Sequence, residues 1–305
     1  MKFPKKIFPF IFLAKKFSFL NNKKGQVLYG CAKKKPEYHV VSFSGGKDST
    51  ALLLRMLELG MKVDEVLNCD TYMEFPQMYQ HIEVIKNIVE SKGIKFVTLR
   101  NSLSFKYLML EYQPERRTAT KDKINGNPKG YSWAGNRSRW CTSKLKTELL
   151  RRYKQELQEK YTVIEYVGIA ADEQYRLERE SNKQHKHPLV DWGWTEADAL
   201  KYCYDKGFDF GGLYEIFDRV SCWCCPLQGL DELYNLRKFF PDLWKELGDM
   251  DSRTWRKFRF DYSVKELEVM FSLQDELIQQ GKFEGRRKQS FRKLFREKLG
   301  DADEK

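Results

Sequence analysis

The sequence predicts an α/β fold: an open, mainly parallel sheet with helices on both faces, followed by a helical C-terminal region. Two observations carry this prediction. From Tyr38 to residue 182, short runs rich in β-branched residues alternate with stretches whose apolar residues recur at helical spacing. After Thr195 the strand pattern fades, and aromatic-rich amphipathic patterns follow. Strands separated by helices are joined by right-handed crossovers, which place the strands parallel in one sheet.

The elements follow one another in order along the chain. The first strand is a β-branched run directly before a Gly-Gly turn, and the helix after it stops at Gly60, a residue type that commonly ends helices. The expected strands cover residues 39–44, 63–69, 95–99 and 161–169. The expected helices cover residues 47–59, 76–91, 102–112, 142–159, 172–182, 230–240, 252–260, 264–280 and 285–299. The polar segment 113–139 is long enough to predict a functional lid or a mobile loop.

Composition divides the chain into three parts. The 305 residues are 41% hydrophobic and 32% charged, an ordinary globular mixture, with a net charge of +12. Residues 1–36 contain ten Lys and no Arg, Asp or Glu. We expect them to be a basic extension outside the fold, because no small-residue cleavage site follows their short apolar run. Residues 37–205 are expected to form the α/β domain, and residues 206–305 a cysteine-containing segment with the helical C-terminal region.

Apolar runs, cysteines and charge exclude some classes of protein. No apolar run approaches the ~20 residues that span a bilayer, so we expect no membrane partner. Seven cysteines in a chain of this length do not indicate a secreted disulfide scaffold; they predict metal or thiol chemistry in a reducing compartment, the cytoplasm. Residues 100–154 hold fourteen Lys and Arg against four acidic residues, which predicts a localised anion site.

The most specific motif is a seven-residue segment between the first strand and the first helix, here called the phosphate loop: Ser44, Gly45, Gly46, Lys47, Asp48, Ser49 and Thr50. Its two glycines let the backbone approach a ligand closely, and the unpaired N–H groups at the start of a helix bind anions. Lys47 adds a cation, Asp48 a helix cap or a metal ligand, and the hydroxyls further donors. An ordinary Gly-Gly turn explains the glycines but not the whole motif.

The phosphate loop resembles that of the PP-loop ATP pyrophosphatases, the adenine nucleotide alpha hydrolases, whose sheet is Rossmann-like. Later segments are similar to the phosphoadenosine phosphosulfate (PAPS) reductase family of that superfamily and occur in the family's order. They are Asp70-Thr71-Tyr-Met-Glu-Phe-Pro, Arg139-Trp-Cys141-Thr, Gly168-Ile-Ala-Ala-Asp172-Glu173 and Pro188-Leu-Val-Asp-Trp. Tyr72 stands where the family usually has glycine, which predicts an altered turn.

The resemblance implies that residues 37–205 bind an adenine nucleotide, either ATP or a sulfated adenine nucleotide, together with Mg²⁺. The implied nucleotide-binding residues are the seven of the phosphate loop and Asp70, Thr71, Gly168, Asp172, Glu173 and Arg176. Asp70 can hold Mg²⁺ or a ribose hydroxyl, or cap a turn, whereas Asp172 and Glu173 also suit a helix N-terminus. We expect Lys47, Asp48 and Arg139 to be catalytic, since an arginine fork binds phosphate or sulfate with two hydrogen bonds.

Four cysteines form a second set of candidate site residues: Cys141, Cys222, Cys224 and Cys225. Three of them lie within four residues, a spacing that suits metal ligands. Iron–sulfur members of the family hold a [4Fe–4S] cluster with a Cys-Cys pair and a later Cys-x-x-Cys pair. Thr142 stands in place of the second cysteine of the first pair, and Cys224 is an additional candidate. The sequence leaves open a [4Fe–4S] cluster, Zn²⁺ or inert thiols.

These motifs favour an enzyme that cleaves ATP to AMP and pyrophosphate and adenylates an acceptor for sulfur transfer. Sulfonucleotide reductases of the family use a cysteine near the C-terminus, and no cysteine follows Cys225. A reductase that uses an external thiol is therefore the second hypothesis. A non-catalytic nucleotide- and metal-binding sensor or partner module is the third. A sulfur donor protein is a possible partner, and tRNA or DNA a possible acceptor, suggested by basic residues of segment 113–139: Arg116, Arg117, Lys121 and Lys123.

Overall fold

The structure, a computed structural model, describes residues 34–124, 126–179 and 184–303. The chain divides into two compact units, residues 1–35 and residues 36–305, and the second carries every element described below. The predicted basic extension, residues 1–36, lies almost wholly outside the described residues. A functional division at residue 206 stays a prediction, because residues on both sides of it belong to the second unit.

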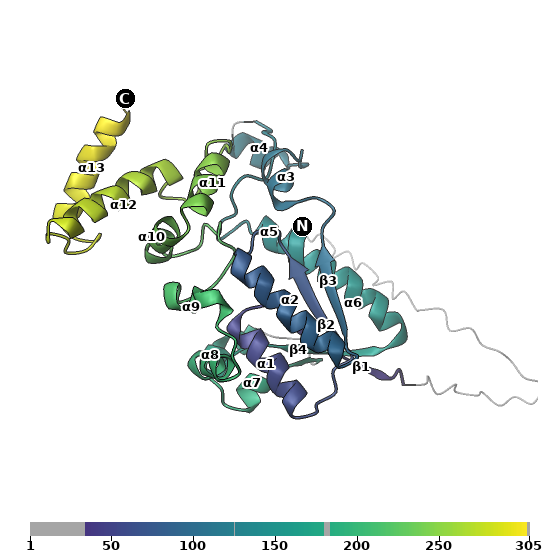
Figure 1. Ribbon diagram of the computed structural model, residues 1–305. Helices are drawn as coiled ribbons and strands as arrows, with labels where there is room; N and C mark the ends of the chain where they lie inside the picture. The colour runs from purple at the N-terminus through teal and green to yellow at the C-terminus, as the bar shows by residue number, and fades with distance from the viewer. Residues whose placement is uncertain (1–33, 125, 180–183, 304–305) are drawn as a thin grey trace, which may run out of the picture. The chain divides into compact units, whose positions relative to one another are not determined.

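The second unit is built on a five-stranded, all-parallel sheet in the order β3-β2-β1-β4-β5 (Figure 1). Its strands are β1 (Glu37–Phe43), β2 (Glu65–Asp70), β3 (Lys95–Arg100), β4 (Thr162–Val167) and β5 (His185–Lys186). The strand order reverses between β1 and β4, which puts the end of β1 at the point where open α/β sheets bind ligands. The predicted parallel α/β fold is confirmed.

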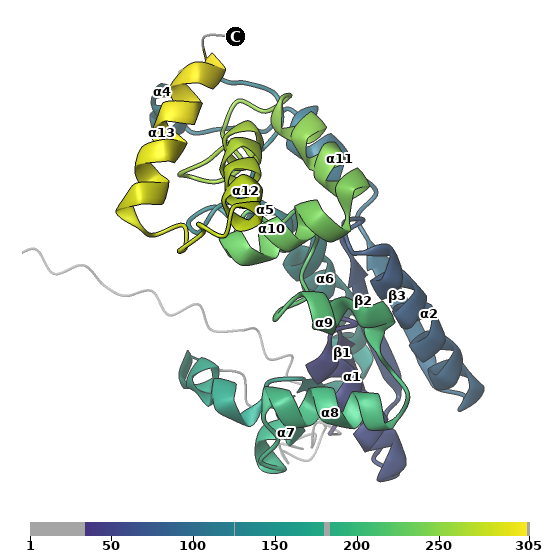
Figure 2. The ribbon, with the colours of Figure 1, turned by 60° about the vertical axis from the view of Figure 1, so that its left-hand side comes forward.

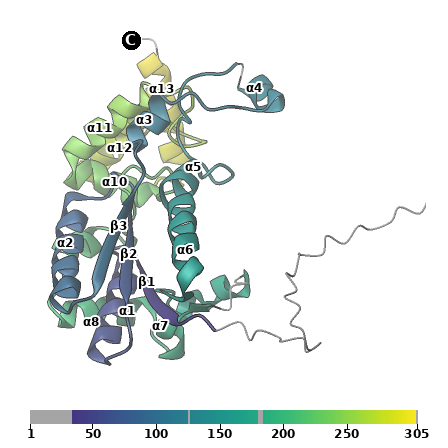
Figure 3. The ribbon, with the colours of Figure 1, turned by 90° about the vertical axis from the view of Figure 1, so that its right-hand side faces the viewer.

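Helices cover both faces of this sheet. Helices α1 (Lys47–Glu58) and α2 (Pro76–Ser91) lie on one face and α6 (Glu148–Lys160) on the other (Figure 3). Two short helices, α3 (Phe105–Leu110) and α4 (Thr118–Lys123), precede α5 (Trp140–Thr142), which a π-helical turn at Ser143–Thr147 joins to α6. Beyond β4 come a 3-10 helix (Ala171–Arg179), α7 (Pro188–Asp191), α8 (Glu196–Asp205), a 3-10 turn (Phe210–Gly212) and α9 (Leu213–Ile216).

Four helices complete the unit beyond the carboxyl ends of the strands (Figures 1 and 2). They are α10 (Leu230–Phe239), α11 (Pro241–Asp251), α12 (Val264–Gln279) and α13 (Gln289–Asp303). Their apolar faces share one buried cluster with residues around α3 and α5. In the described part of the chain, no helix has both the length and the apolar character that a membrane span needs.

The apolar side chains of β1 point alternately to the two faces of the sheet, which explains why helices cover both faces. Val41 and Phe43 pack with α1 and α2, whereas Val40 packs with Leu157 of α6. Successive side chains of a strand point to opposite faces, so a strand that is apolar at both needs a helix on each. The phosphate loop thereby lies at the end of a strand that is held from both sides.

The C-terminal region departs from one sequence prediction. Residues 252–260, expected to be helical, form turns and bends, and α11 precedes them instead. Helix α11 starts at Pro241, a favoured first residue, and buries Trp244 and Leu247. Asp251, at its end, accepts hydrogen bonds from Trp133 Nε1 at 2.8 Å and from the N–H of Val264 at 2.7 Å. These contacts end α11 and start α12, so the helix expected between them does not form.

Two smaller differences lie nearer the phosphate loop. The segment after β4 was predicted as an α-helix over residues 172–182, but residues 171–179 are a 3-10 helix, and residues 180–183 lie outside the described ranges. Tyr72 has a φ of 65°, the left-handed conformation that favours glycine, so the altered turn expected from losing a glycine is wrong in this respect. The Tyr72 hydroxyl donates to the Asn101 carbonyl at 2.8 Å and secures this conformation.

Candidate functional site

The phosphate loop joins β1 to the first turn of α1, and its hydroxyls hold its shape. Ser49 Oγ donates to the Gly46 carbonyl at 3.0 Å, and Thr50 Oγ1 donates to the Gly45 carbonyl at 3.3 Å. Gly45 has a φ of 85°, and a Cβ there would lie 2.9 Å from Ile82 Cγ1, so glycine is required. Since these hydroxyls have partners inside the loop, an anion there would have to use mainly the backbone N–H groups at the start of α1.

The carboxyl end of β4 closes against this loop. Gly168 follows β4 directly, and a Cβ on it would lie 2.9 Å from the backbone carbon of Asp48 and from the backbone nitrogen of Ser49. Only a residue without a side chain allows the two backbones to approach so closely. Gly168 therefore supports the loop in the structure, and its contact with a nucleotide stays a prediction.

Lys47 is buried at the loop and paired with two carboxylates. Its Nζ lies 2.5 Å from Glu196 of α8 and 3.1 Å from Asp48. Burial alone would lower the pKa of Lys47, but hydrogen bonding to Glu196 and the charge of Asp48 outweigh it and raise the pKa. Burial raises the pKa of Asp48, against the pull of Lys47. Lys47 is thus a cation held ready beside the loop, and a phosphate must compete with Glu196 for it.

The other predicted residues near β4 have partners in the protein. The Asp172 carboxylate accepts the N–H of Glu196 at 3.1 Å, which fixes the start of α8. Glu173 and Arg176 form an ion pair at 2.5 Å. None of the three lines either of the two cavities described below. Their contact with a nucleotide stays a prediction, whereas the role of Asp172 in positioning Glu196 beside Lys47 is visible.

Tyr214 of α9 also touches the phosphate loop. Its hydroxyl accepts the backbone N–H of Lys47 at 2.9 Å. Burial raises the pKa of this phenol, so it stays protonated. The N–H of Lys47 is one of the groups that an anion at this loop would use, and in the structure Tyr214 occupies it.

Replacing Tyr214 by phenylalanine tests whether its hydroxyl stabilises the fold and whether it competes with an anion for the Lys47 N–H. We expect the free energy of unfolding to fall by about 1 kcal/mol, because the Lys47 N–H loses its acceptor. We also expect pyrophosphate to bind a few times more tightly, since it no longer displaces a hydroxyl. Urea denaturation and calorimetry measure the two effects. Tyr202→Phe, which removes a hydroxyl bonded to Glu58 away from the loop, is the control. Weaker pyrophosphate binding in Tyr214→Phe would contradict this competition.

Behind the loop, His81 of α2 is buried and holds Thr50. Its Nε2 lies 3.0 Å from Thr50 Oγ1, and burial lowers the pKa of His81 to about 4. An unfolded histidine has a pKa near ~6.5. Because the unfolded state takes up a proton first as the pH falls, His81 should lower the stability by up to about 3 kcal/mol between pH 6.5 and pH 4. Urea denaturation across this pH range should show a smaller loss of folding stability in His81→Gln than in the wild type. Equal losses of stability in the two proteins would contradict the role given to His81.

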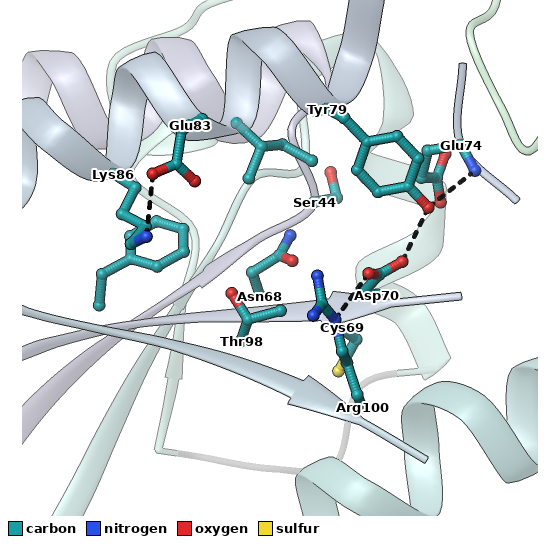
Figure 4. A pocket seen from close by; sticks show the side chains of 12 residues that line it. Ser44, Asn68, Cys69, Asp70, Glu74, Tyr79, Glu83, Lys86, Thr98 and Arg100 are labelled. Carbon is teal, nitrogen blue, oxygen red and sulfur yellow. Dashed lines mark hydrogen bonds and ion pairs between the residues drawn. The ribbon is translucent and has the colours of Figure 1, made fainter. Parts of the chain in front are cut away.

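A cavity of about 430 Å³, the β2–α2 cavity, opens beside the loop (Figure 4). Ser44 lies at its loop side, and the apolar side chains of Ile82 and Phe96 contribute to its wall. Asp70 also lines it, but its carboxylate is paired with Arg100 Nε at 2.8 Å and accepts the Tyr79 hydroxyl at 2.9 Å. Asp70 thus lines the cavity, the Arg100 and Tyr79 contacts occupy oxygens that Mg²⁺ would need, and its binding of a nucleotide or Mg²⁺ stays a prediction.

A second cavity of about 340 Å³, the cysteine cavity, lies on the other side of Ser44. Gly46 and Thr71 line it, together with Arg139 and all four candidate metal ligands: Cys141, Cys222, Cys224 and Cys225. Thr71 Oγ1 lies 3.4 Å from Cys222 Sγ, so the predicted nucleotide segment and the predicted metal segment are in contact. The structure thus brings together residues that are 181 positions apart in the chain, from Ser44 to Cys225.

The family model for the phosphoadenosine phosphosulfate reductase domain matches residues 38–228 of this chain. The chain belongs to the PAPS reductase family. The matched range includes all of β1 but its first residue, the strands β2 to β5, the phosphate loop and the four cysteines of the cysteine cavity. It also includes Tyr214 and Glu196, to which the motifs assigned no role, and each of which reaches the loop from a helix far along the chain.

Two curated relatives come from Methanocaldococcus jannaschii. Uncharacterized protein MJ0066 is 28% identical over 218 residues, which are 68% of this chain and 40% of that protein. Uncharacterized protein MJ0973 is 28% identical over 223 residues, 70% of this chain and 47% of that protein. The chain spans less than half of the length of these relatives. Among solved structures, the U34-tRNA thiolase NcsA from Methanococcus maripaludis with its [4Fe–4S] cluster has 15% identity and a TM-score of 0.36, covering 79% of this chain and 74% of that one.

The thiols of this PAPS reductase-family chain surround a volume and do not converge on a point. Burial raises the pKa of Cys222, Cys224 and Cys225. Among the described residues, no three His, Cys, Asp or Glu side chains are arranged to hold a single metal ion. A zinc site needs all its sulfurs about 2.3 Å from one metal ion. In an iron–sulfur cluster, by contrast, each thiolate binds a different iron atom. As placed, the four cysteines, which all lie in the described ranges, share one cavity lining but form no single-ion site, and a cluster at this cavity stays a prediction.

Glu74 is a further site residue that sequence analysis missed. It lies between Thr71 and the start of α2, and it lines both cavities. Its Oε1 accepts hydrogen bonds from Thr71 Oγ1 at 3.2 Å and from Cys222 Sγ at 3.4 Å. The sequence could have pointed to Glu74 through its position in the Asp70–Pro76 segment. That segment resembles a nucleotide-binding segment, however, and gives no indication that one of its carboxylates also lines a second cavity.

Proposed function

We propose that this PAPS reductase-family chain binds ATP on the phosphate loop, cleaves it to AMP and pyrophosphate, and adenylates an acceptor for sulfur transfer. One observation carries the proposal: Ser44 and Glu74 line both the β2–α2 cavity and the cysteine cavity. A nucleotide held at the loop would therefore have room for its nucleoside on one side and for an acceptor on the other. The proposed setting is the cytoplasm, with a sulfur donor protein as a partner.

The nucleoside is proposed to occupy the β2–α2 cavity. Ile82 and Phe96 offer apolar surface to a base, and Asn68 and Thr98 offer polar atoms. The phosphates would then extend past Ser44 to the start of α1. There the helix N-terminus and Lys47 would stabilise the negative charge that develops on the leaving pyrophosphate.

The proposed reaction is a displacement at the α-phosphorus. A lone pair on an acceptor oxygen forms the new P–O bond, the bond between the α-phosphorus and the bridging oxygen breaks, and pyrophosphate leaves with that electron pair. The acceptor proton needs a base, and Glu74 is proposed because its carboxylate faces both cavities. Arg139, which lines the cysteine cavity, would neutralise charge on the α-phosphate. Mg²⁺ is proposed to accompany the triphosphate.

The metal centre is proposed to be an iron–sulfur cluster held by Cys141, Cys222, Cys224 and Cys225. When bound, such a cluster would supply electron-transfer chemistry beside the acceptor. The protein's own contribution is to exclude water with Trp223 and the buried Cys224, and to place Lys146 at the thiols. Burial alone would lower the pKa of Lys146, but the charges of Cys222 and Glu74 outweigh it and raise the pKa, which suits a site with negative charge.

Pyrophosphate release from ATP tests the proposal. Anaerobically purified, metal-replete protein is incubated with ATP and Mg²⁺, alone and with tRNA, DNA or a sulfide donor. Release that depends on an acceptor supports the proposal. Reduction of a sulfated adenine nucleotide with an added thiol, without release from ATP, would instead identify a sulfonucleotide reductase. Nucleotide binding without turnover in any combination would indicate a sensor or partner module.

A further inference from the structure

Four arginines lie in the lining of the cysteine cavity or at the hairpin next to it. Arg139 and Arg219 line the cavity itself. Arg137 lies on the short hairpin that Gly135 and Ser138 close, directly before Arg139. Arg256 reaches the same hairpin: a Cβ on Gly135 would lie 2.7 Å from its Nη2. We use the term arginine rim for these four residues: Arg137, Arg139, Arg219 and Arg256.

The charges of the arginine rim are not neutralised within the protein. In the described ranges of the chain, none of the four guanidinium groups has a carboxylate partner, although many other basic side chains of this chain do. Arg137, Arg139 and Arg219 are also exposed. Four arginines without carboxylate partners among the described residues, two in the cavity lining and two at the adjacent hairpin, concentrate positive charge here, and planar guanidinium groups bind phosphate with two hydrogen bonds.

The loop between α11 and α12, residues 252–262, adds aromatic surface next to this rim. Arg259 fastens the loop to the edge of the cysteine cavity, because its Nη1 donates to the Gln228 carbonyl at 2.5 Å and to that of Pro226 at 3.4 Å. Phe260, the next residue, is 86% exposed. Trp255 is 38% exposed, and the guanidinium carbon of Arg116 lies 5.6 Å from its ring centroid.

We propose that the arginine rim and the 252–262 loop bind a single-stranded nucleic acid and present one of its bases to the cysteine cavity. The proposal deepens, and rests on, the proposed function, since it names the class of acceptor. Arginines at intervals suit successive phosphates, and an exposed aromatic ring suits an unstacked base. A duplex fits less well, because the rim is made by a hairpin and a loop and offers no helix to a groove.

Fluorescence anisotropy with a labelled 20-nucleotide RNA tests this surface, with the same strand as DNA and the matching duplexes as comparisons. We expect either single strand to bind more tightly than its duplex. The double variant Arg137→Gln/Arg256→Gln should bind the strand about tenfold more weakly, and the slope of log affinity against log salt should become shallower by about 1.4. Phe260→Ala should weaken single-strand binding about tenfold and leave the salt slope unchanged.

Two matched controls lie elsewhere on the unit. Arg292→Gln/Arg296→Gln removes two exposed charges from α13, and Phe239→Ala removes a half-exposed ring from α10. Neither should change strand binding. Equal losses in the control and rim variants, or equal affinity for duplex and single strand, would overturn the proposal.

Calorimetry with ATP keeps this proposal separate from the proposed function. ATP binding without strand binding overturns the nucleic-acid surface and leaves the nucleotide site standing. Strand binding that depends on the rim, without ATP binding, supports the surface and contradicts the nucleotide site. Unchanged ATP affinity in Arg137→Gln/Arg256→Gln would show that the variant is folded. Preference for RNA over DNA among the strands would identify the 2′-hydroxyl as part of what is recognised.

Discussion

Replacing Lys47 by alanine is expected to lower the rate of pyrophosphate release from ATP by about 100-fold or more. Removal of one preorganised charge-stabilising donor commonly costs that much. Lys47 Nζ is the only ammonium group among the described residues that pairs with both Asp48 and Glu196, at the first turn of α1. Its alanine variant keeps the glycines and the helix N-terminus, so ATP should still bind. Single-turnover release of labelled pyrophosphate measures the change.

The control for this experiment is Lys206→Ala. Lys206 ends α8 and pairs with Glu58 at 2.8 Å, so it is also an ion-paired lysine, but it has no contact with the phosphate loop. Loss of this lysine should leave the rate of pyrophosphate release within a factor of about two of the wild-type rate, because an exposed ion pair contributes little energy. Glu196→Gln offers a second comparison, because it removes one of the two carboxylate partners of Lys47 and keeps the lysine and Asp48. A Lys47→Ala rate close to that of the wild type would refute the catalytic role of the lysine.

Replacing Cys222 by serine is expected to reduce bound iron to about a tenth of the wild-type content or less, since a lost ligand exceeds the 10–100-fold effect of losing a supporting residue. Cys222 contacts both Thr71 and Glu74, so the same change should slow turnover. Iron and zinc content of anaerobically purified protein, together with its visible absorbance, measures the first effect. A fully folded wild-type protein without metal would end the metal-centre proposal.

Cys69→Ser is the matched control for the metal experiment. Cys69 lines the β2–α2 cavity and not the cysteine cavity, and burial raises the pKa of its thiol to about 11. Its replacement should leave the metal content unchanged. Iron loss as great as that of Cys222→Ser would show that the metal is held nonspecifically by thiols.

Much of the fold could be predicted because its signals are local. The run before Gly45 and the helical spacing up to Gly60 predicted β1 and α1 to within two residues. Residues 252–260 were mispredicted because the contacts of Asp251 with Trp133 and Val264 decide their conformation, and the first of these crosses 118 positions of the chain. The sequence indicates propensity, whereas such long-range contacts become visible only in three dimensions.

The candidate site shows the same division. The phosphate loop and the four cysteines were predictable from spacing, and the structure brings them to one cavity. The contact of Tyr214 with the loop was not, because an isolated tyrosine on an amphipathic helix has no distinctive pattern, and neither was the contact of Glu196 with Lys47, which spans 149 positions of the chain. The same holds for Arg256, which lies in a segment that the sequence predicted to be helical and which contacts the hairpin only because that segment is a loop.

The close approach of Gly168 to the backbone of Asp48 has a consequence for how this site could change over time. With no space between the two main chains, the loop cannot widen for a bulkier ester unless β4 shifts with it. Its geometry is therefore set when the sheet assembles. Room for a different ligand would have to come from the cavity walls, while the backbone of the loop stays the same.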